Sequence, residues 1–306
     1  MSTVLVGSTG FVGGNLRSFH DFDACYHSTD ISESFGTCPD LVVYAGVTAE
    51  KYLANRAPQA DRAKVRQAYD NLKAMRPRKV VLISTIDVYK DPCGKNESSP
   101  MEVDGLHPYG RNRLELEDLV RTEFDTFVIR LPALFGTGLK KNFIYDALTR
   151  IPTMLSEEKY HELAEKIPMM PDCYRLEPNG LYRCCAEGNL RSGLYEAFCH
   201  NDWSALNFTD SRSTFQFYDL SWLWRDLSKG LELGLEVLNL TSEPVSASEV
   251  FSHCFSGSFR NELPSGPVHY DLRSIHAAVF GGSDGYCYSK SQILDALLTF
   301  TKGENR

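Results

Sequence analysis

The segment YGRNR places a tyrosine and an arginine four positions apart, at Tyr109 and Arg113. In a helix, residues with this spacing project from the same face. A tyrosine, with a free pKa of about 10, exchanges protons poorly at neutral pH unless a nearby cation favours its phenolate. Arg113 would supply such a cation one turn away. The pair therefore predicts a tyrosine that works as an acid–base group.

Two more polar residues, Thr85 and Asp87, follow the apolar run KVVLIS in the segment STIDVY. The run predicts a strand at 79–84, and ligands bind beyond the carboxyl ends of strands in parallel sheets. Thr85 is placed to hydrogen-bond a substrate carbonyl or hydroxyl while Tyr109 moves its proton. Asp87 has two interpretations, an acid–base carboxylate or a solvated or helix-capping one.

Near the N-terminus, the glycine-rich segment GSTGFVG joins a short apolar strand to a helix. Glycine suits such a turn because a side chain would keep the backbone away from a pyrophosphate. The helix N-terminus then offers free N–H groups and the positive end of its dipole. The spacing is G-x-x-G-x-x-G, which differs from the common G-x-G-x-x-G pattern. The segment predicts a dinucleotide-binding turn made of Gly7, Ser8, Thr9, Gly10, Phe11, Val12 and Gly13.

The end of the second predicted strand, at 24–27, bears on which dinucleotide binds. NAD sites commonly place an acidic residue there to hold the ribose 2′-hydroxyl. That position falls near Ser28, beside His27, whereas Asp30 comes slightly late. Small hydroxyls and a histidine can accept a 2′-phosphate, so the sequence favours NADP over NAD. A shift of one residue in the strand end would reverse this preference.

These residues need a parallel sheet to bring them together. Predicted strands at 24–27, 40–46, 79–84 and 126–131 alternate with predicted helices at 50–76 and from 109 onward. This alternation is typical of a doubly wound, Rossmann-type α/β sheet. After residue 140 the pattern loosens, and residues 150–210 show helical pieces without clear strand alternation. We therefore expect a dinucleotide-binding domain at 1–150, rejoined by a strand near 235–240, and a smaller, irregular domain at 151–306 that mainly binds substrate.

Composition narrows the class of protein. The 306 residues carry a formal charge of −8, which argues against non-specific binding to nucleic acid. Nine cysteines without a C-x-x-C motif suit reduced thiols in a cytoplasmic protein, and the histidines lack the spacing of a metal site. No run approaches the ~18 apolar residues of a membrane span. We expect a cytoplasmic protein with no membrane or nucleic-acid partner and no metal.

Together, the glycine turn, STIDVY, the Tyr109 segment and RLPALFG (130–136) resemble the extended short-chain dehydrogenase/reductase family, in its NAD-dependent epimerase/dehydratase branch that acts on nucleotide sugars. The resemblance implies a Ser/Thr, Tyr and Lys set in which tyrosine is the acid–base group and lysine holds the nicotinamide ribose. Thr85 and Tyr109 match the first two positions. Arg113 stands where lysine belongs, and its planar, bulkier fork makes the exchange non-conservative.

The resemblance also implies further contacts. It adds Ala45, Gly46, Tyr109, Arg113 and Pro132 to the cofactor-binding residues. On the substrate side, Lys141 and Asn142 in GLKKNFIYDAL are similar to the segment that contacts the nucleotide diphosphate, and Arg212 occupies the position of an arginine that binds the phosphates. A guanidinium suits a diphosphate because its fork donates two parallel hydrogen bonds. The helix that carries the tyrosine often forms a dimer interface in this family, so the resemblance implies a homodimer.

Two functions follow as expectations. Family dehydratases carry an adjacent Asp–Glu pair after the threonine, and this sequence has Ile86 and Asp87 there, so oxidation and reduction are favoured over dehydration. The first expectation is an NAD(P)-dependent enzyme that epimerises a nucleotide-linked sugar or reduces a keto-sugar, with catalytic residues Thr85, Tyr109, Arg113 and Asp87. The second is a dinucleotide-binding sensor or scaffold with a degenerate active site, which the exchange at Arg113 leaves open.

Overall fold

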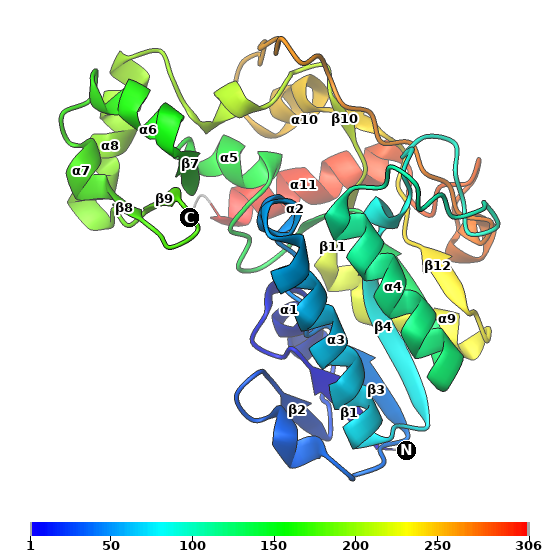
Figure 1. The fold of residues 1–306 in the computed structure, drawn as a ribbon. Coiled ribbons are helices and arrows are strands. Elements are labelled where there is room, and N and C mark those ends of the chain that lie inside the picture. Colours follow the sequence, from blue (N-terminus) through cyan, green and yellow to red (C-terminus); the bar gives the residue numbers. More distant parts are fainter. Residues whose placement is uncertain (1, 305–306) are drawn as a thin grey trace. The chain divides into compact units, whose positions relative to one another are not determined.

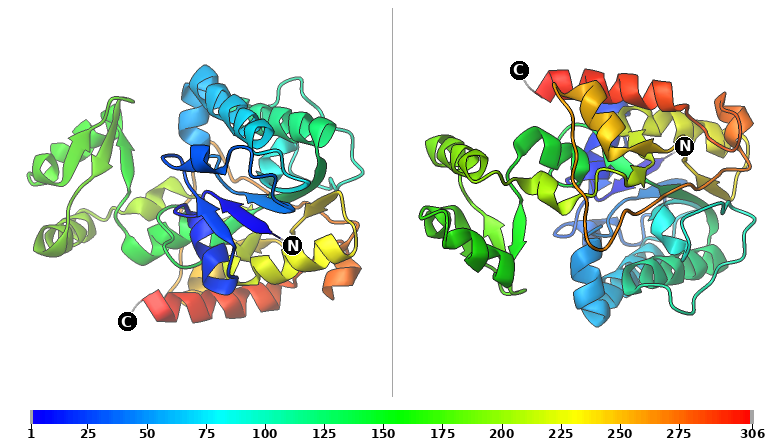
Figure 2. Two further views of the ribbon diagram at one scale, coloured as in Figure 1. Left: turned by 90° about the horizontal axis from the view of Figure 1, so that it is seen from below. Right: turned by 90° about the horizontal axis from the view of Figure 1, so that it is seen from above.

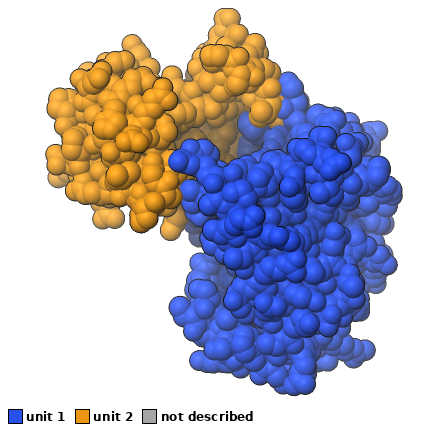
Figure 3. Space-filling view, viewed as in Figure 1, with its two compact units in different colours: residues 1–138, 215–245, 269–297 blue, residues 139–214, 246–268, 298–306 orange. Residues whose placement is uncertain are grey.

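The computed structural model describes residues 2–304, and these fold into two compact units. Within these described residues, unit 1 contains 2–138, 215–245 and 269–297, and unit 2 contains 139–214, 246–268 and 298–304. Figure 3 colours the two units separately. Every catalytic and cofactor-binding residue predicted from the sequence belongs to unit 1, whereas Lys141, Asn142 and Arg212 belong to unit 2.

The centre of unit 1 is a six-stranded parallel sheet (Figure 1). Its strands are β1 (Thr3–Val6), β2 (Ala24–Tyr26), β3 (Leu41–Tyr44), β4 (Lys79–Thr85), β5 (Asp125–Leu131) and β12 (Val237–Asn239), in the order β12-β5-β4-β3-β1-β2. The chain enters the sheet at β1 and later strands add on both sides of it, which is the doubly wound arrangement. The predicted Rossmann-type α/β fold is confirmed.

Helices cover both faces of this sheet (Figure 2). Helices α3 (Pro58–Met75) and α4 (Pro108–Glu123) pack together on one face, and α1 (Phe11–Phe19) and α9 (Leu223–Glu232) pack together on the other. Leu72 and Val120 of the first pair join Val42 and Val80 of the sheet in one apolar core. All four residues of β3 are buried because both of its faces are covered.

The remaining elements of unit 1 are short. They are α2 (Lys51–Arg56), the 3₁₀ turns η1 (Ile31–Ser34), η2 (Ile86–Val88), η4 (Leu220–Trp222) and η5 (Ala277–Phe280), and the parallel pair β6 (Ala133–Phe135) and β11 (Phe217–Asp219). The single helix predicted at 50–76 is divided into α2 and α3. The break falls at Ala57 because Pro58 has no N–H to continue a helix but suits the first position of a new one.

Unit 2 contains a small antiparallel sheet that the sequence pattern did not indicate. Its strands are β7 (Met154–Ser156), β8 (Tyr174–Leu176) and β9 (Leu181–Cys184), in the order β7-β9-β8. The helical elements of this unit are α5 (Phe143–Thr149), α6 (Glu157–Ala164), α7 (Met170–Cys173), α8 (Gly188–His200), η3 (Ala205–Phe208) and α10 (Ala247–Cys254). Strands of three or four residues are too short to show a two-residue alternation, which explains why they were missed.

Three elements contain residues of both units: β10 (Thr214–Phe215), β13 (Val245–Ser246) and α11 (Lys290–Glu304). Across residues 2–304, the structure contains no helix with both the length and the apolar character that a membrane crossing requires.

Candidate active site

The glycine turn leads from β1 into α1, and its backbone is closely packed. Gly7 has a φ of +89°, and a Cβ atom there would lie 2.5 Å from the carbonyl oxygen of Ala45. A Cβ atom at Gly13 would lie 2.2 Å from the carbonyl oxygen of Gly7. Backbone atoms cannot move aside as a flexible side chain can, so the fold of the turn itself requires these two glycines. The turn and Ala45, predicted separately as cofactor-binding residues, are adjacent.

Gly10 has a different environment. It is the N-cap of α1, a helix of nine residues, and as a glycine it has no side chain that could cap the N-terminus of the helix. The first N–H groups of a helix have no intrahelical partner and favour a bound anion. The glycine backbone at the start of α1 lies beyond the carboxyl end of β1, an internal strand of the sheet. This position suits the pyrophosphate of a dinucleotide.

At the end of β2, His27 and Asp30 form a pair. Asp30 Oδ2 lies 3.1 Å from His27 Nε2, and Asp30 Oδ1 accepts a hydrogen bond of 2.6 Å from the backbone N–H of His27. Thr29 Oγ1 lies 2.9 Å from His27 Nδ1, and Ser28 is exposed between them. The turn therefore brings the carboxylate that comes late in the sequence back to the strand end. Groups suited to a ribose hydroxyl and groups suited to a 2′-phosphate lie together there.

Tyr109 lies in the first turn of α4, which is held in place at its N-terminus. The Nδ1 atom of His107 accepts a hydrogen bond of 3.0 Å from the backbone N–H of Gly110 and so caps the helix. The backbone N–H of Tyr109 donates to Asn55 Oδ1 of α2 at 3.0 Å. Tyr109 is 5% exposed, and the guanidinium of Arg113 lies 4.6 Å from its ring centroid. The predicted shared helix face of Tyr109 and Arg113 is confirmed.

Arg113 is engaged by partners that the sequence did not reveal. Its Nη1 and Nη2 atoms donate to the two carboxylate oxygens of Asp61 at 3.1 and 3.0 Å, and Nη2 also donates to the Thr48 carbonyl oxygen at 2.7 Å. Both charged side chains are buried, with 5% and 8% of their surface exposed. An arginine has five N–H groups, so two remain for other partners.

A signal for Asp61 was present in the sequence of α3. Asp61 lies on the same helix face as the buried residues Val65, Ala68 and Leu72, in a helix that is otherwise strongly polar. A carboxylate on a buried stripe needs a paired cation. The sequence could therefore have predicted that Asp61 has a buried partner, but not that the partner is Arg113.

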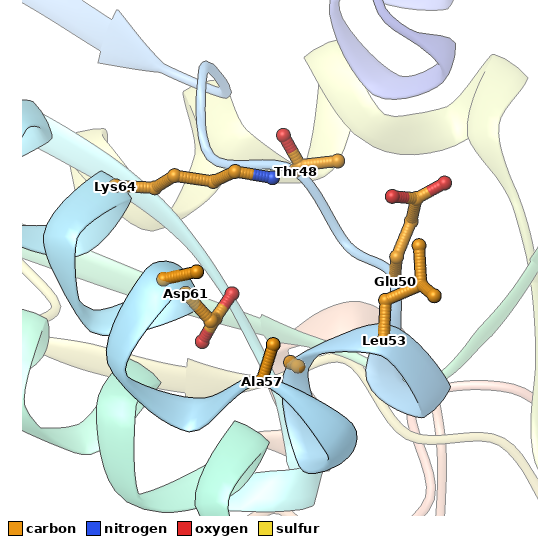
Figure 4. Close-up of a pocket in the computed structure, with 8 residues that line it drawn as sticks. Thr48, Glu50, Leu53, Ala57, Asp61 and Lys64 are labelled. Carbon is orange, nitrogen blue, oxygen red and sulfur yellow. The ribbon is translucent and has the colours of Figure 1, made fainter. Parts of the chain in front are cut away.

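Thr48 and Asp61 also line a pocket beside α2 and α3 (Figure 4). Its other lining residues are Glu50, Leu53, Ala54, Ala57, Ala60 and Lys64. The small alanine side chains leave this space between the two helices. The ion pair of Arg113 and Asp61 thus joins α4 to α3 and borders the pocket at the start of α3.

The acidity of Tyr109 reflects several opposing effects. Burial raises the pKa of Tyr109 above its ordinary value, and the Asp87 carboxylate adds to the rise. Arg113, and to a smaller extent Thr85, favour the phenolate and act in the other direction. Arg113 therefore favours the phenolate, but burial outweighs its effect and the pKa of Tyr109 stays above its ordinary value.

Thr85 and Asp87 have different hydrogen-bonding roles in the turn that follows β4. Thr85 Oγ1 accepts a hydrogen bond of 3.1 Å from the backbone N–H of Asp87 and so caps η2. The hydroxyl proton of Thr85 stays available to donate, because this bond uses only an acceptor site of the oxygen. The Asp87 carboxylate does not cap η2; it accepts a hydrogen bond of 2.6 Å from Lys51 Nζ and one of 3.2 Å from the hydroxyl of Tyr270.

A buried polar network fixes α4 against the sheet. Glu117, two turns after Tyr109, accepts three hydrogen bonds of 2.6–3.1 Å from Arg130 and one of 2.5 Å from Ser84 Oγ. Arg130 Nη1 donates to the hydroxyl of Tyr89 at 2.7 Å. Burial by itself lowers the pKa of Arg130, but Glu117 and Tyr89 outweigh it and hold that pKa above its ordinary value. Glu117 thus holds the helix that carries Tyr109 onto β4 through Ser84 and onto β5 through Arg130.

The residues predicted to bind the nucleotide diphosphate lie in unit 2 and have partners of their own. Asn142 Oδ1 accepts hydrogen bonds from the backbone N–H groups of Ile144 and Tyr145 at 2.9 and 3.3 Å and caps α5. Arg212 donates to both carboxylate oxygens of Asp210 at 2.9 and 2.7 Å. A diphosphate at Arg212 would therefore compete with Asp210. Lys141 is exposed.

No family model matches this sequence, and no curated protein matches it. Solved structures do match along the whole chain. The dTDP-4-dehydrorhamnose reductase from Yersinia enterocolitica has a TM-score of 0.62 at 14% identity, over 99% of both chains. The UDP-glucose 4-epimerase from Thermotoga maritima, solved with UDP-glucose, has a TM-score of 0.61 at 11% identity, over 99% of this chain and 98% of that one.

A third match is RMD from Pseudomonas aeruginosa, solved with NADPH, with a TM-score of 0.61 at 16% identity over 99% of this chain and 100% of that one. These comparisons show that the chain shares the fold of nucleotide-sugar epimerases and reductases over its whole length. The fold implied by the resemblance of the sequence motifs is confirmed.

Proposed function

We propose that this protein is an extended short-chain dehydrogenase/reductase that uses NADP or NAD to epimerise a nucleotide-linked sugar or to reduce a keto-sugar. The observation that carries the proposal is that the start of α4, with the buried Tyr109 beside Arg113, packs directly on the turn of Thr85 to Asp87 beyond the carboxyl end of β4. In the same unit, the bare glycine turn opens α1 beyond the carboxyl end of β1. Parallel strands end at one edge of the sheet, so both features belong to that edge.

The two hydroxyl groups have separate roles in the proposed reaction. A bound nicotinamide supplies the hydride chemistry. Tyr109 Oη takes the proton of a sugar hydroxyl when the sugar is oxidised and returns it to the carbonyl oxygen when the sugar is reduced. Thr85 Oγ1 donates a hydrogen bond to the same oxygen and orients it, since the bond that it accepts from the Asp87 N–H leaves its own proton free to donate.

Arg113 takes the place of the lysine in this proposal. Two of its five N–H groups are not used by Asp61 and Thr48, and these are the groups that would meet Tyr109 and the nicotinamide ribose. Support for the ligands comes from the matching structures, since RMD was solved with NADPH and the epimerase with UDP-glucose. Our preference for NADP rests on His27 and Ser28, with Asp30 as the competing acidic group.

The test is turnover with a defined tyrosine variant. Nicotinamide absorbance is followed with UDP-, GDP- and dTDP-linked sugars for the wild type and for Tyr109→Phe. Loss of the acid–base group is expected to lower kcat by about 10²–10⁴-fold without loss of dinucleotide binding. Tyr69→Phe, a tyrosine on α3 that bonds Glu123, is the matched control and should keep full activity. Equal rates for Tyr109→Phe and the wild type would refute the proposal.

A second function is favoured by the environment of Arg113. Because Asp61 and Thr48 hold the guanidinium, a protein that binds the dinucleotide without turning it over would fit the same site. Such a sensor or scaffold would bind NADPH or NADH in a calorimeter and show no absorbance change with any of the three groups of nucleotide sugars.

A further inference from the structure

Lys51, Asp87 and Tyr270 form a polar cluster from three distant parts of unit 1. Lys51, the first residue of α2, donates hydrogen bonds to Asp87 Oδ1 at 2.6 Å and to the Tyr270 hydroxyl at 3.2 Å. The Tyr270 hydroxyl in turn donates to Asp87 Oδ1 at 3.2 Å. The side chain of Asp87 is 18% exposed and that of Lys51 is 40% exposed. The cluster closes a triangle of hydrogen bonds around one carboxylate oxygen.

This carboxylate belongs to the turn that supports the acid–base tyrosine. A Cβ atom at Gly110, the residue after Tyr109, would lie 2.1 Å from the carbonyl oxygen of Asp87, so the start of α4 packs directly on that turn. The ring of His107, whose Nε2 atom lies 3.9 Å from Asp87 Oδ1, is also close to the Tyr109 ring, with 6.3 Å between the two ring centroids. A negative charge on Asp87 opposes a negative charge on the phenol, and it raises the pKa of Tyr109.

Arg113 and His107, two basic residues close to Tyr109, do not neutralise the negative charge of Asp87. The charge of Arg113 is matched by Asp61 in a buried ion pair. His107 Nε2 lies 3.9 Å from Asp87 Oδ1, but His107 Nδ1 accepts the helix-capping hydrogen bond from Gly110 and must stay unprotonated to do so. Burial and the charge of Lys51 also lower the pKa of His107. Lys51 is therefore the cation that neutralises Asp87.

We propose that Lys51 is a positioning residue for proton transfer: by holding and neutralising Asp87, it allows Tyr109 to carry the negative charge that the reaction requires. This inference rests on the proposed function of Tyr109. Tyr270 has the supporting role of holding Lys51 and Asp87 together.

The test measures the ionisation of the tyrosine without relying on turnover. A 3,5-difluorotyrosine is placed at position 109 by genetic code expansion in the full-length protein, and its ¹⁹F shift is titrated against pH. Lys51→Met is expected to raise the midpoint by about one pH unit, and Asp87→Asn to lower it by a similar amount. The double variant Lys51→Met/Asp87→Asn should return close to the starting value, because both charges of the pair are gone.

Two controls separate charge from structure. Lys51→Arg keeps the cation and should leave the midpoint within a few tenths of a pH unit of the original. Lys73→Met removes an exposed lysine near the other end of α3 and should have no effect. In parallel, kcat at neutral pH for the natural tyrosine should fall about tenfold in Lys51→Met and stay unchanged in Lys73→Met.

The inference is wrong if Lys51→Met leaves the ¹⁹F midpoint unchanged, or if the double variant shifts as far as Lys51→Met alone. A purely structural Lys51 would give the second result, because removing Asp87 as well would not restore the packing. The proposed function fails separately, when Tyr109→Phe turns over as fast as the wild type. In that case the ¹⁹F titration still decides whether Lys51 controls the charge at position 109.

Discussion

The buried ion pair of Arg113 and Asp61 allows a prediction about the residue that departs from the family pattern. Arg113 makes three hydrogen bonds to charged or carbonyl groups, two with Asp61 and one with Thr48. Arg113→Met removes the cation and leaves a carboxylate that is 8% exposed with a hydrogen bond from Asn112 but no charged partner. Breaking a buried pair from one side costs about 3–5 kcal/mol. The free energy of unfolding in urea should fall by this amount.

Two companion variants test whether the expected loss of unfolding free energy comes from the unpaired carboxylate of Asp61. Arg113→Lys keeps a positive charge near Asp61. Its single ammonium nitrogen cannot reproduce the bidentate hydrogen bonds to the Asp61 carboxylate together with the bond to the Thr48 carbonyl oxygen. We expect it to lose about 2 kcal/mol, roughly the value of one hydrogen bond to a charged group. Arg113→Met/Asp61→Leu removes both charges, and replacing a whole buried pair with apolar residues is often close to neutral. The double variant should therefore be more stable than Arg113→Met alone.

Activity provides a second readout of the same pair. In Arg113→Lys/Asp61→Asn the ammonium is released from the carboxylate, so it can serve the phenol and the ribose as the family's lysine does. We expect this double variant to turn over faster than Arg113→Lys alone. The reasoning is refuted if Arg113→Met loses less than about 1 kcal/mol, or if the losses of Arg113→Met and Asp61→Leu simply add in the double variant.

Two further predictions concern the helix cap and the choice of dinucleotide. His107 has a lowered pKa in the folded protein, chiefly through burial and then through Lys51. Its contribution to stability is therefore present above the pKa of about 6.5 of the unfolded chain and is lost as the pH falls through the folded value. Urea unfolding at about pH 7.5 and about pH 5.5, values flanking that pKa by about one unit, should show a larger fall in the free energy of unfolding for the wild type than for His107→Asn. The asparagine caps without titrating, and the difference should approach about 1 kcal/mol; parallel curves would contradict the assigned cap. Asp30→Asn removes a negative charge 3.1 Å from His27 and should tighten the binding of NADP⁺ relative to NAD⁺ by several-fold in calorimetric titrations, because the 2′-phosphate is no longer repelled. An unchanged ratio of the two dissociation constants would mean that the 2′-phosphate lies elsewhere.

Local patterns in the sequence determined the framework of unit 1. Apolar runs separated by helices predict a parallel sheet whatever their long-range partners are, because parallel strands need such crossovers. The glycine turn was recognisable because the backbone conformation at Gly7 and the close approach at Gly13 exclude side chains. The shared face of Tyr109 and Arg113 followed from their spacing of four residues. Each of these features depends on residues that are near one another in the chain.

The tertiary structure alone decided which charges meet around Tyr109. Asp61 is 52 positions from Arg113, Lys51 is 36 positions from Asp87, and Tyr270 is 183 positions from Asp87. No local pattern selects these partners, since the sequence contains 32 lysines and arginines and 40 acidic residues. Which cation pairs with which carboxylate depends on how α2, α3 and α4 pack on the sheet. For this reason the sequence identified the acid–base tyrosine, but only the folded chain determined the electrostatic environment that sets its pKa.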